Sequence, residues 1–391
     1  QRSLVGSEMC IRDRPKEGEN PYACASDILK MWQDKGILKI EDKPAIYIYE
    51  EEFSVGNTRK SIKGIIARVQ LEEFSKGIIL PHEFTLSKAK EDRLNLMKAT
   101  NCNFSQIYAL YMDEKHTTLA TIDEQSKAKA DLEFTDETGV THRLWIETDE
   151  EIIAKLVADF ADRKLYIADG HHRYETALNY RNYCRENGIS KPGDPQDFQM
   201  IYLVDMEHPG LVVFPTHRLV RDLPNFDKEA VLEKCSEFFY IDEKEGTDTM
   251  EEDLKKLYDE GKKAFGFYCG KGEWFLLTLK NIDFMSQMLP DVSKASQSLD
   301  VSVLHTLILE KIFGIDKENM AKQINLTYTK FFTEAIDGVD KGEFQCSFVL
   351  NPTRVTEIRD VAAAGEKMPQ KSTYFYPKMI TGMVMNNLGV D

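Results

Sequence analysis

KLYIADGHHRYETALNYRNYCREN, residues 164–187, contains the clearest local structural signal in this chain. Its apolar first part, KLYIAD, is typical of a short strand, and the residues from about His171 to Asn187 favour a helix. Gly170 stands between the two, and glycine permits the tight turn that such a junction requires. The sequence therefore predicts a strand that delivers Asp169 directly to the start of a helix.

Further strands and helices are predicted on both sides of this junction. Their mixture predicts an α+β (mixed α/β) fold rather than a helical bundle or a sandwich. The final part of the chain returns to a strand, a helix and an aromatic, basic tail. The expected strands are 44–53, 63–70, 102–112, 164–169, 198–206 and 210–220, with a hairpin at 130–146 and helices at 25–33, 87–98, 149–162 and 171–187.

With 391 residues, the chain is long enough for two or three domains. Residues 1–14, QRSLVGSEMCIRDR, match the style of a translated sequencing adapter, so we expect an artefact there, although a native segment is the alternative. We expect residues 15–222 to form a catalytic domain and residues 223–344 to form a second α+β domain or insertion. Residues 345–391 are expected to return to the core.

The composition limits the possible partners. Lys and Arg number 50 against 66 Asp and Glu, a formal net charge of −16, and such a surface repels nucleic acid and anionic membranes. Any anionic ligand must therefore meet a local basic pocket. The chain has no run of 18 apolar residues, and its seven scattered cysteines contain no C-x-x-C pair. We expect a cytoplasmic protein without zinc, disulfides or a membrane span.

The predicted helix start is suited to an anion. A helix N-terminus presents backbone N–H groups without intrahelical partners, together with the positive end of the helix dipole. Gly170 allows a ligand to approach closely, and Arg173 can bind phosphate through two N–H groups. His171 and His172 add hydrogen-bond donors or acid–base groups.

Asp169 needs a separate explanation, because a carboxylate repels phosphate. It could hold Mg²⁺ beside the phosphate, or it could accept a proton from an attacking hydroxyl. A purely structural alternative is that Asp169 caps the helix and that the histidines are surface or core residues. The five consecutive residues D-G-H-H-R favour the functional interpretation.

A second candidate group lies in LPHEFTLSKAKEDR, residues 80–93. Glu83 is expected at the end of a strand and Arg93 on the following basic helix, an arrangement that suits an acid–base group with phosphate-binding cations. A solvated charged helix after an edge strand is the alternative.

Two more segments could contribute. PTHRLV places His217 and Arg218 just past a strand that could lie beside the Asp169 strand, and MPQKSTYFYPK, with Lys371, could close over a ligand or simply dock on the surface. His305, in an otherwise apolar helix, is expected to be a buried structural histidine.

ADGHHRYETA resembles the central motif of domain-of-unknown-function family 1015. HEFT, DR, PTHRLV, LDVSVLH and KSTYFYPK stand in the same order as in that family, and the resemblance extends from Pro21 to Asp391. A family-typical P-Y-D-V segment near the N-terminus is absent. The D-G-H-H-R turn is also similar to the phosphate-binding turn of the ParB/sulfiredoxin-like superfamily, which includes free serine kinases. The resemblance thus implies a ParB/sulfiredoxin-like phosphate-binding core with a second α+β domain.

The resemblance implies phosphoryl transfer to or from the hydroxyl of serine, with Mg²⁺ and ATP or ADP as partners. Serine kinase and phosphoserine phosphatase share the same in-line geometry, so the sequence does not separate them. The alternative is a nucleotide-binding regulatory protein of the ParB type, although the chain has no basic DNA-reading helix. The candidate catalytic residues are Asp169 (base or metal ligand), His172 and Glu83; the candidate phosphate or nucleotide ligands are Gly170, His171, Arg173, Arg93, His217, Arg218 and Lys371.

Overall fold

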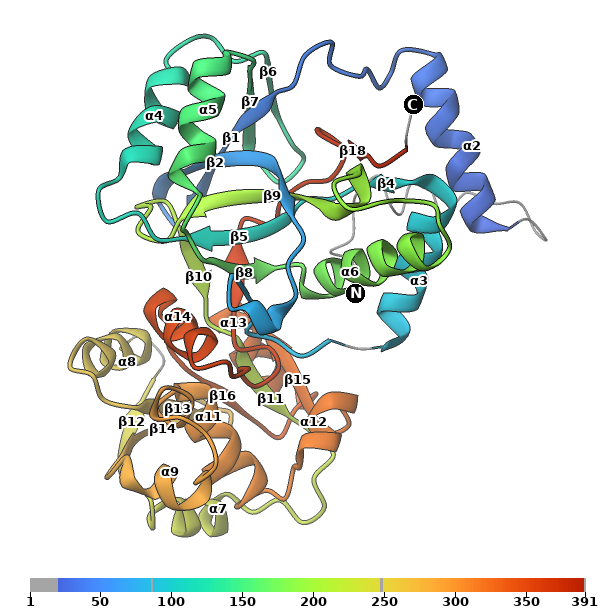
Figure 1. Ribbon diagram of the computed structural model, residues 1–391. Helices are drawn as coiled ribbons and strands as arrows, with labels where there is room; N and C mark the ends of the chain where they lie inside the picture. Colours follow the sequence, from blue (N-terminus) through green and yellow to red (C-terminus); the bar gives the residue numbers. More distant parts are fainter. Residues whose placement is uncertain (1–19, 86, 247–248, 390–391) are drawn as a thin grey trace. The chain divides into compact units, whose positions relative to one another are not determined.

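The computed structural model describes residues 20–85, 87–246 and 249–389 (Figure 1). The chain divides into two compact units. Of the described residues, those up to 211 together with 377–389 form the first unit, and those from 212 to 376 form the second. Both units contain helices and sheets, so the predicted mixed α+β class is confirmed. No helix in the described part of the chain is long and apolar enough to cross a membrane.

The first unit is built on an eight-stranded sheet of order β3-β8-β5-β9-β2-β1-β7-β6. Neighbouring strands are antiparallel except for the pairs β3–β8 and β5–β9. β8, which ends at Asp169, lies between β3 and β5. The strands are β1 Ile46–Val55, β2 Thr58–Gln70, β3 Ile79–Leu80, β5 Ile107–Tyr111, β6 Leu132–Thr135, β7 Thr141–Glu147, β8 Leu165–Asp169 and β9 Phe198–Asp205.

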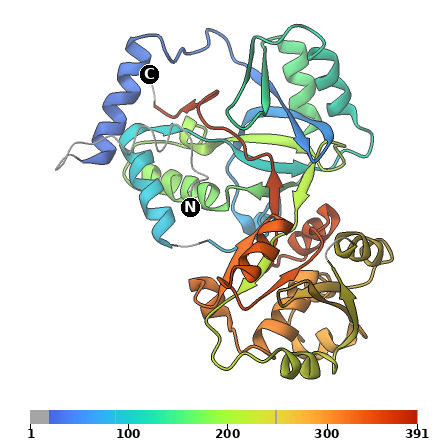
Figure 2. The same cartoon turned by 180° about the vertical axis from the view of Figure 1, so that it is seen from behind.

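Local signals account for the helices of this unit. Asp149 caps α5 by accepting the backbone N–H groups of Glu151 and Ile152, and Pro21 starts α2 where a missing N–H costs nothing. α3 and α6 lie side by side in both views (Figures 1 and 2). The helices are α2 Pro21–Asp34, α3 Ser87–Thr100, α4 Thr117–Gln125, α5 Glu150–Asp159 and α6 His171–Glu186, with short 3₁₀ turns η1 Phe74–Lys76 and η2 Pro195–Asp197; β4 Cys102–Asn103 pairs with β18 Asn386–Asn387.

The two faces of the eight-stranded sheet differ because side chains alternate along each strand. One face carries the aliphatic core, for example Ile48, Ile65 and Ile201. The opposite face carries buried tyrosines, among which Tyr202 packs edge-on against Tyr49 with ring centroids 5.4 Å apart. The sheet therefore has an apolar side and an aromatic, more polar side.

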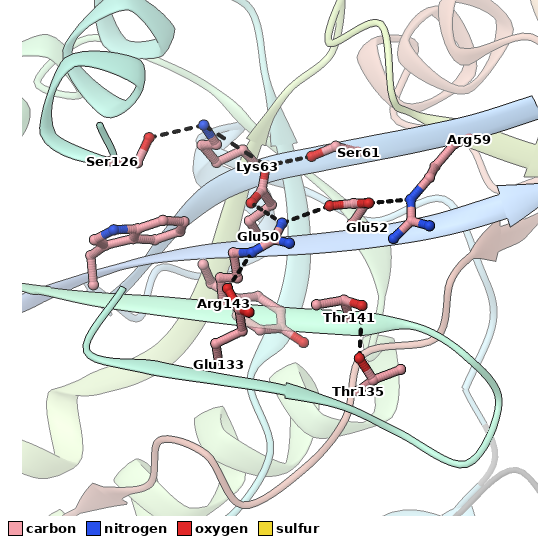
Figure 3. Close-up of polar contacts among 12 residues, drawn as sticks. Glu50, Glu52, Arg59, Ser61, Lys63, Ser126, Glu133, Thr135, Thr141 and Arg143 are labelled. Carbon is pink, nitrogen blue, oxygen red and sulfur yellow. Dashed lines mark hydrogen bonds and ion pairs between the residues drawn. The ribbon is translucent and has the colours of Figure 1, made fainter. Parts of the chain in front are cut away.

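Three consecutive glutamates in β1 show this alternation. Glu50 and Glu52 both accept hydrogen bonds from Arg143 of β7, which also binds Glu133 of β6 (Figure 3). Glu51 points to the other face and is only 1% exposed. The same strand thus provides an ion-pair network on one side and a buried carboxyl group on the other.

The second unit contains a six-stranded sheet of order β12-β14-β13-β16-β11-β15. The pairs described in this sheet are antiparallel, and its core includes the fully buried Trp274. Its strands are β11 His217–Val220, β12 Phe239–Glu245, β13 Ala264–Tyr268, β14 Glu273–Leu279, β15 Leu326–Thr329 and β16 Cys346–Val349. Its helices are α7 Lys228–Cys235, α8 Met250–Asp259, α9 Asp283–Met288, α10 Lys294–Gln297, α11 Asp300–Val303, α12 Lys317–Lys322, α13 Phe332–Asp340 and α14 Val355–Ala363, with the π-helix η3 Leu304–Glu310.

Two strands of the second unit form a separate small sheet. β10 Val212–Phe214 pairs antiparallel with β17 Tyr374–Tyr376, and these strands stand at the two points where the chain passes between the units. A single strand was expected over residues 210–220. The structure corrects this, because Pro215 lacks an N–H for strand pairing and separates β10 from β11.

The position of β11 corrects a second expectation. β11 pairs with β15 and β16 in the second unit, whereas β8 pairs with β3 and β5 in the first. The strand that carries His217 and Arg218 therefore does not pair with the Asp169 strand. The two compact units divide at 211/212 and 376/377, and boundaries at 222/223 and 344/345 were expected from the sequence.

Candidate functional site

The predicted strand–turn–helix junction is present in the structure. β8 ends at Asp169, and Gly170 is the N-cap of α6 with φ 101° and ψ 25°. No side chain of the described residues caps this helix start. A Cβ on residue 170 would lie only 2.9 Å from Arg173 Nε, so glycine is needed both for the backbone conformation and for the room it leaves.

Both carboxylate oxygens of Asp169 are bound by cations. Arg173 Nη2 donates to Oδ2 at 2.6 Å, and Lys378 Nζ donates to Oδ1 at 2.7 Å. Burial raises the pKa of Asp169, but Lys378 and Arg173 outweigh this and hold the pKa well below its usual range. Asp169 is therefore ionised at neutral pH and is a poor proton acceptor. The structure favours a role as a counter-ion that fixes two cations.

Lys378 was not among the candidate residues predicted from the sequence. It lies in the C-terminal segment that belongs to the first unit, 209 positions after Asp169. The segment KSTYFYPK was noted as polar and aromatic, but its local pattern does not show which of its residues reaches another element. Only the long-range pairing identifies Lys378.

Arg173 and Arg93 line the same small cavity between α3 and α6, with a volume of about 30 Å³. Arg173 Nη1 also donates to the carbonyl of Gln106. No carboxylate is among the described residues that line the cavity. The cavity is small, so a phosphoryl group would need a small outward movement of these side chains. The other lining residues are Leu96, Met97, Cys102, Asn103, Phe104, Ser105, Thr176 and Gln199.

His171 connects the site to the segment after β3. The backbone N–H of His82 donates to His171 Nε2 at 3.1 Å, which places the proton of a neutral His171 ring on Nδ1. That nitrogen lies 3.5 Å from Glu83 Oε2, and the Glu83 side chain is 34% exposed. His171 is therefore buried close to Glu83, whose carboxylate remains partly accessible.

His172 lies among charged groups of α3 and α6. Burial lowers the pKa of His172, and Arg93 lowers it further, against an opposing contribution from Glu175. Glu175 binds Lys90 at 2.6 Å and Thr85 at 2.7 Å. His172 is thus neutral at pH 7 and can act as a hydrogen-bond donor or acceptor in this site.

The residues around Asp169 do not fit a resident Mg²⁺ ion. A magnesium site requires oxygen ligands at close range, but both Asp169 oxygens face ammonium or guanidinium groups. Among the described residues, no group of three or more His, Cys, Asp or Glu side chains could hold a metal ion. We therefore assign no step to a metal.

The remaining candidates lie in the second unit. Arg218 is fully buried and donates to the carbonyls of Thr216 and Lys371 and to His305 Nε2. Burial lowers the pKa of His217 to about 3, and the His217 ring accepts the backbone N–H of Leu350. These contacts are typical of structural side chains, and the buried position predicted for His305 is confirmed.

The fold and the site together define a two-unit α+β protein with two arginines and a lysine gathered at a helix N-terminus. The chain belongs to the family described as "Protein of unknown function (DUF1015)", whose family model matches residues 9–302. This confirms the resemblance carried by ADGHHRYETA. A comparison with curated proteins finds no match.

Several solved structures are similar to the chain. One is a conserved hypothetical protein from Pyrococcus furiosus, with 15% sequence identity, a TM-score of 0.38 and coverage of 83% of this chain and 95% of that one. Another is a mutant of a free serine kinase in complex with ADP, with 12% identity, a TM-score of 0.39 and coverage of 79% and 87%. A third is C-terminally truncated SbnI from Staphylococcus aureus, with 11% identity, a TM-score of 0.36 and coverage of 82% and 85%. At these values, a function has to be assigned from the residues of this chain.

Proposed function

We propose that this protein is a small-molecule phosphotransferase that acts on the hydroxyl of free serine or on phosphoserine, with ATP or ADP as the nucleotide partner. The observation that carries the proposal is the gathering of Arg93, Arg173 and Lys378 at the uncapped start of α6. These three cations belong to a chain of net charge −16, and two of them bind Asp169. Such a local group of cations suits a phosphoryl group.

The chemistry of phosphoryl transfer depends mainly on positioning and charge stabilisation. Charge spreads over the oxygens of the transferred group, and fixed donors stabilise it. Arg173 and Arg93 supply guanidinium donors from two different helices, and the first turn of α6 supplies backbone N–H groups.

Glu83 is the best placed proton acceptor. Asp169 is held ionised by two cations, whereas Glu83 is partly exposed and lies 3.5 Å from Nδ1 of the buried His171 ring. In the kinase direction, Glu83 accepts the proton of the serine hydroxyl while the serine oxygen forms a bond to phosphorus. The bond between phosphorus and the nucleotide oxygen breaks, and the negative charge leaves with the nucleotide. The choice of serine follows from the resemblance of the D-G-H-H-R turn to that of free serine kinases.

The test is a direct assay. The full chain is incubated with serine and ATP or ADP, and separately with phosphoserine, with and without MgCl₂, and products are followed by ³¹P NMR. Calorimetry measures the affinity for nucleotide and inorganic phosphate. We expect turnover and binding that Arg173→Met reduces at least tenfold.

The matched control is Arg185→Met, because Arg185 is on the same helix and also pairs with a carboxylate, Asp197. We expect it to leave binding unchanged. Nucleotide binding without turnover would favour the regulatory alternative. If the protein neither binds nucleotide or phosphate nor turns over any of these substrates, the proposal is wrong.

A further inference from the structure

A row of hydrogen-bonded side chains in the first unit runs from the buried Glu51 to the turn of the β6–β7 hairpin. The Tyr49 hydroxyl lies 3.1 Å from Glu51 Oε1 and 2.7 Å from His142 Nδ1. The other ring nitrogen, His142 Nε2, lies 3.2 Å from Asp136 Oδ2. We call these four residues the proton chain. Its first three members are at most 1% exposed, whereas the Asp136 side chain is 23% exposed, so the proton chain connects the interior to the surface.

The outer end of the proton chain organises the hairpin turn. Asp136 Oδ1 accepts hydrogen bonds from the backbone N–H groups of Thr138 and Val140 and from the Thr138 hydroxyl. The backbone N–H of Asp136 donates to the carbonyl of Val140. The His142 ring also stacks on Phe134 of β6, with ring centroids 5.0 Å apart. Asp136 and His142 therefore hold the turn and β6 against β7.

The β6 strand depends on such contacts, because it is the outermost strand of the eight-stranded sheet. It pairs with β7 alone among the described strands, and each of its residues is exposed. The Thr135 and Thr141 hydroxyls lie 2.9 Å apart across the hairpin, as Figure 3 shows. A strand with few buried contacts opens locally at a low free energy. The loss of one buried hydrogen bond should therefore affect this strand measurably.

The protonation state of Glu51 sets the direction of every hydrogen bond in the proton chain. With a proton on Glu51, its carboxyl group donates to Tyr49, and the Tyr49 hydroxyl donates to His142 Nδ1. The neutral His142 ring then donates from Nε2 to Asp136. Each proton is used once, and each buried polar atom of the row has a partner.

Ionised Glu51 cannot keep this order. Its proton passes to solvent, and the carboxylate attracts the single proton of the Tyr49 hydroxyl. Nδ1 of the neutral His142 ring then has no donor, or the ring carries its proton on Nδ1 and loses the hydrogen bond to Asp136. Either way, a buried hydrogen bond of His142 is lost, which costs about 1–3 kcal/mol.

The surroundings of Glu51 contain no compensating cation. Among the described residues, no Lys or Arg forms an ion pair with Glu51, and Ile62 of β2 stands opposite it in the ladder. The titratable groups outside the proton chain that interact with Glu51 are Tyr108 of β5 and Tyr202 of β9. Burial raises the pKa of both tyrosines well above the usual value, so they stay neutral.

The charge states at neutral pH fit the fully bonded order. Burial raises the pKa of Glu51 to about 8, and burial lowers the pKa of His142. Glu51 therefore carries a proton at pH 7 while His142 is neutral. As pH rises, Glu51 is the member of the proton chain that changes its charge.

We infer that the proton chain is a pH-dependent lock on the β6–β7 hairpin: a proton on Glu51 holds β6 and the turn closed on β7, and loss of that proton loosens them. The inference is independent of the proposed function, because no member of the proton chain lines the cavity at Arg93 and Arg173.

The experiment measures hydrogen exchange of the Asp136 and Val140 amides by NMR at pH 6.5 and pH 9.5 in the full chain. Rates are expressed as protection factors, which removes the direct effect of pH on exchange. Ring ¹⁵N shifts of His142 report which of its nitrogens carries a proton. The amides of β1 are followed in parallel, because they separate local opening of the hairpin from unfolding of the whole unit.

Three variants complete the experiment. Glu51→Gln places an uncharged donor beside Tyr49 at every pH, as protonated Glu51 does. Tyr49→Phe removes the hydroxyl that links Glu51 to His142. Tyr111→Phe is the matched control, because the Tyr111 hydroxyl is also buried in this sheet and has no hydrogen-bond partner among the described residues.

We expect the protection factors of Asp136 and Val140 to fall about tenfold between pH 6.5 and pH 9.5 in the wild type, and to stay below those of β1 at both values. Tyr111→Phe should behave as the wild type. Glu51→Gln should keep the high protection at both pH values, and Tyr49→Phe should show the low protection at both.

Four results would each overturn the inference. They are wild-type protection that does not change with pH, a tenfold fall that persists in Glu51→Gln or in Tyr49→Phe, and protection factors in the hairpin that equal those of β1. The fourth is a doubly protonated His142 ring at pH 9.5, because the Glu51 proton would then have moved to the ring and both ring hydrogen bonds would remain.

Discussion

Asp169 Oδ1 and Lys378 Nζ lie 2.7 Å apart although the two residues are 209 positions apart in the sequence. The same carboxylate binds Arg173 through its other oxygen. One anion therefore holds two cations that would otherwise repel each other, and it holds them at the start of α6. The arrangement prepares a positive site before any ligand arrives, which is the form of electrostatic preorganisation that favours phosphate chemistry.

Replacing Asp169 with asparagine should strengthen the binding of inorganic phosphate. Asp169→Asn keeps the shape of the side chain but removes the negative charge nearest to the proposed anion. We expect Kd to fall about fivefold, measured by calorimetry at low ionic strength. The control is Asp197→Asn, which removes the partner of Arg185 at the other end of α6. Weaker binding in Asp169→Asn would contradict this prediction. It would show that the loss of the Arg173 position costs more affinity than the removal of the negative charge gains.

Lys378→Met should have the opposite effect. Loss of this ammonium group leaves one positive charge fewer in the site, so we expect phosphate to bind about five- to tenfold more weakly. The pKa of Asp169 should rise toward its usual range, because Lys378 is the larger of the two charges that lower it. NMR titration of the Asp169 carboxyl carbon measures this directly. Lys76→Met, at an exposed ion pair of the same unit, should change neither quantity.

Gly170→Ala tests the geometry of the turn. The new residue would have to adopt φ 101°, and its Cβ would approach the Arg173 guanidinium to 2.9 Å from Nε. We expect a loss of about 1–3 kcal/mol in unfolding free energy and displacement of Arg173 with loss of phosphate affinity. Gly188→Ala is the matched control, since Gly188 follows the other end of α6 with φ 68° and has no atoms within 4 Å of its Cβ position. It should cost stability without changing phosphate affinity.

Glu51 gives a pH-dependent stability that can be tested separately from the candidate site. Burial raises the pKa of Glu51 to about 8, against an opposing hydrogen bond from Tyr49 and with a further increase from Asp136. The Tyr49 hydroxyl lies 3.1 Å from Glu51 and 2.7 Å from His142 Nδ1, and its single proton can serve only one of them. A protonated Glu51 removes this conflict, which is consistent with the raised pKa.

Between pH 4.5 and about 8, the folded protein keeps a proton on Glu51 that the unfolded chain releases. The unfolding free energy should therefore fall as pH rises through this window and level off above it. The unfolding free energy of the wild type should fall by up to about 1.4 kcal/mol per pH unit because of Glu51, and Glu51→Gln should remove this fall. In urea titrations, the stability of the variant relative to the wild type should therefore increase from pH 5 to pH 8. Glu52→Gln is the control, because Arg143 lowers the pKa of Glu52 and its carboxylate stays charged in both states. An equal slope in wild type and Glu51→Gln would contradict this prediction.

Local patterns were sufficient to predict the β8–α6 junction. Its strand, its glycine and its helix are all determined by residues 164–187, so the positions of Gly170 and Arg173 followed from the sequence alone. The strand expected over residues 44–53 corresponds to β1, Ile46–Val55. These features depend on neighbours within a few residues.

Long-range pairing could not be predicted in the same way. His217 and Arg218 were expected beside the Asp169 strand, but β11 pairs with β15 and β16, which come from residues more than 100 positions later. Lys378 was missed for the same reason, because its partner is determined by the return of the C-terminal segment to the first unit. A single sequence gives the type of each strand but not its neighbour in the sheet.

Glu83→Gln should separate catalysis from binding. Glutamine keeps the size of the side chain, but it cannot take the proton of a serine hydroxyl. We expect kcat for serine phosphorylation to fall at least about 100-fold, the usual contribution of a general base, while the affinity for nucleotide and phosphate stays within about twofold of the wild type. Glu72→Gln, in the same unit at an ion pair with Lys76, is the control and should leave kcat unchanged. If Glu83→Gln retains full turnover while Asp169→Asn loses it, the proton acceptor is Asp169 after all, and the Lys378 and Arg173 contacts must then open during the reaction.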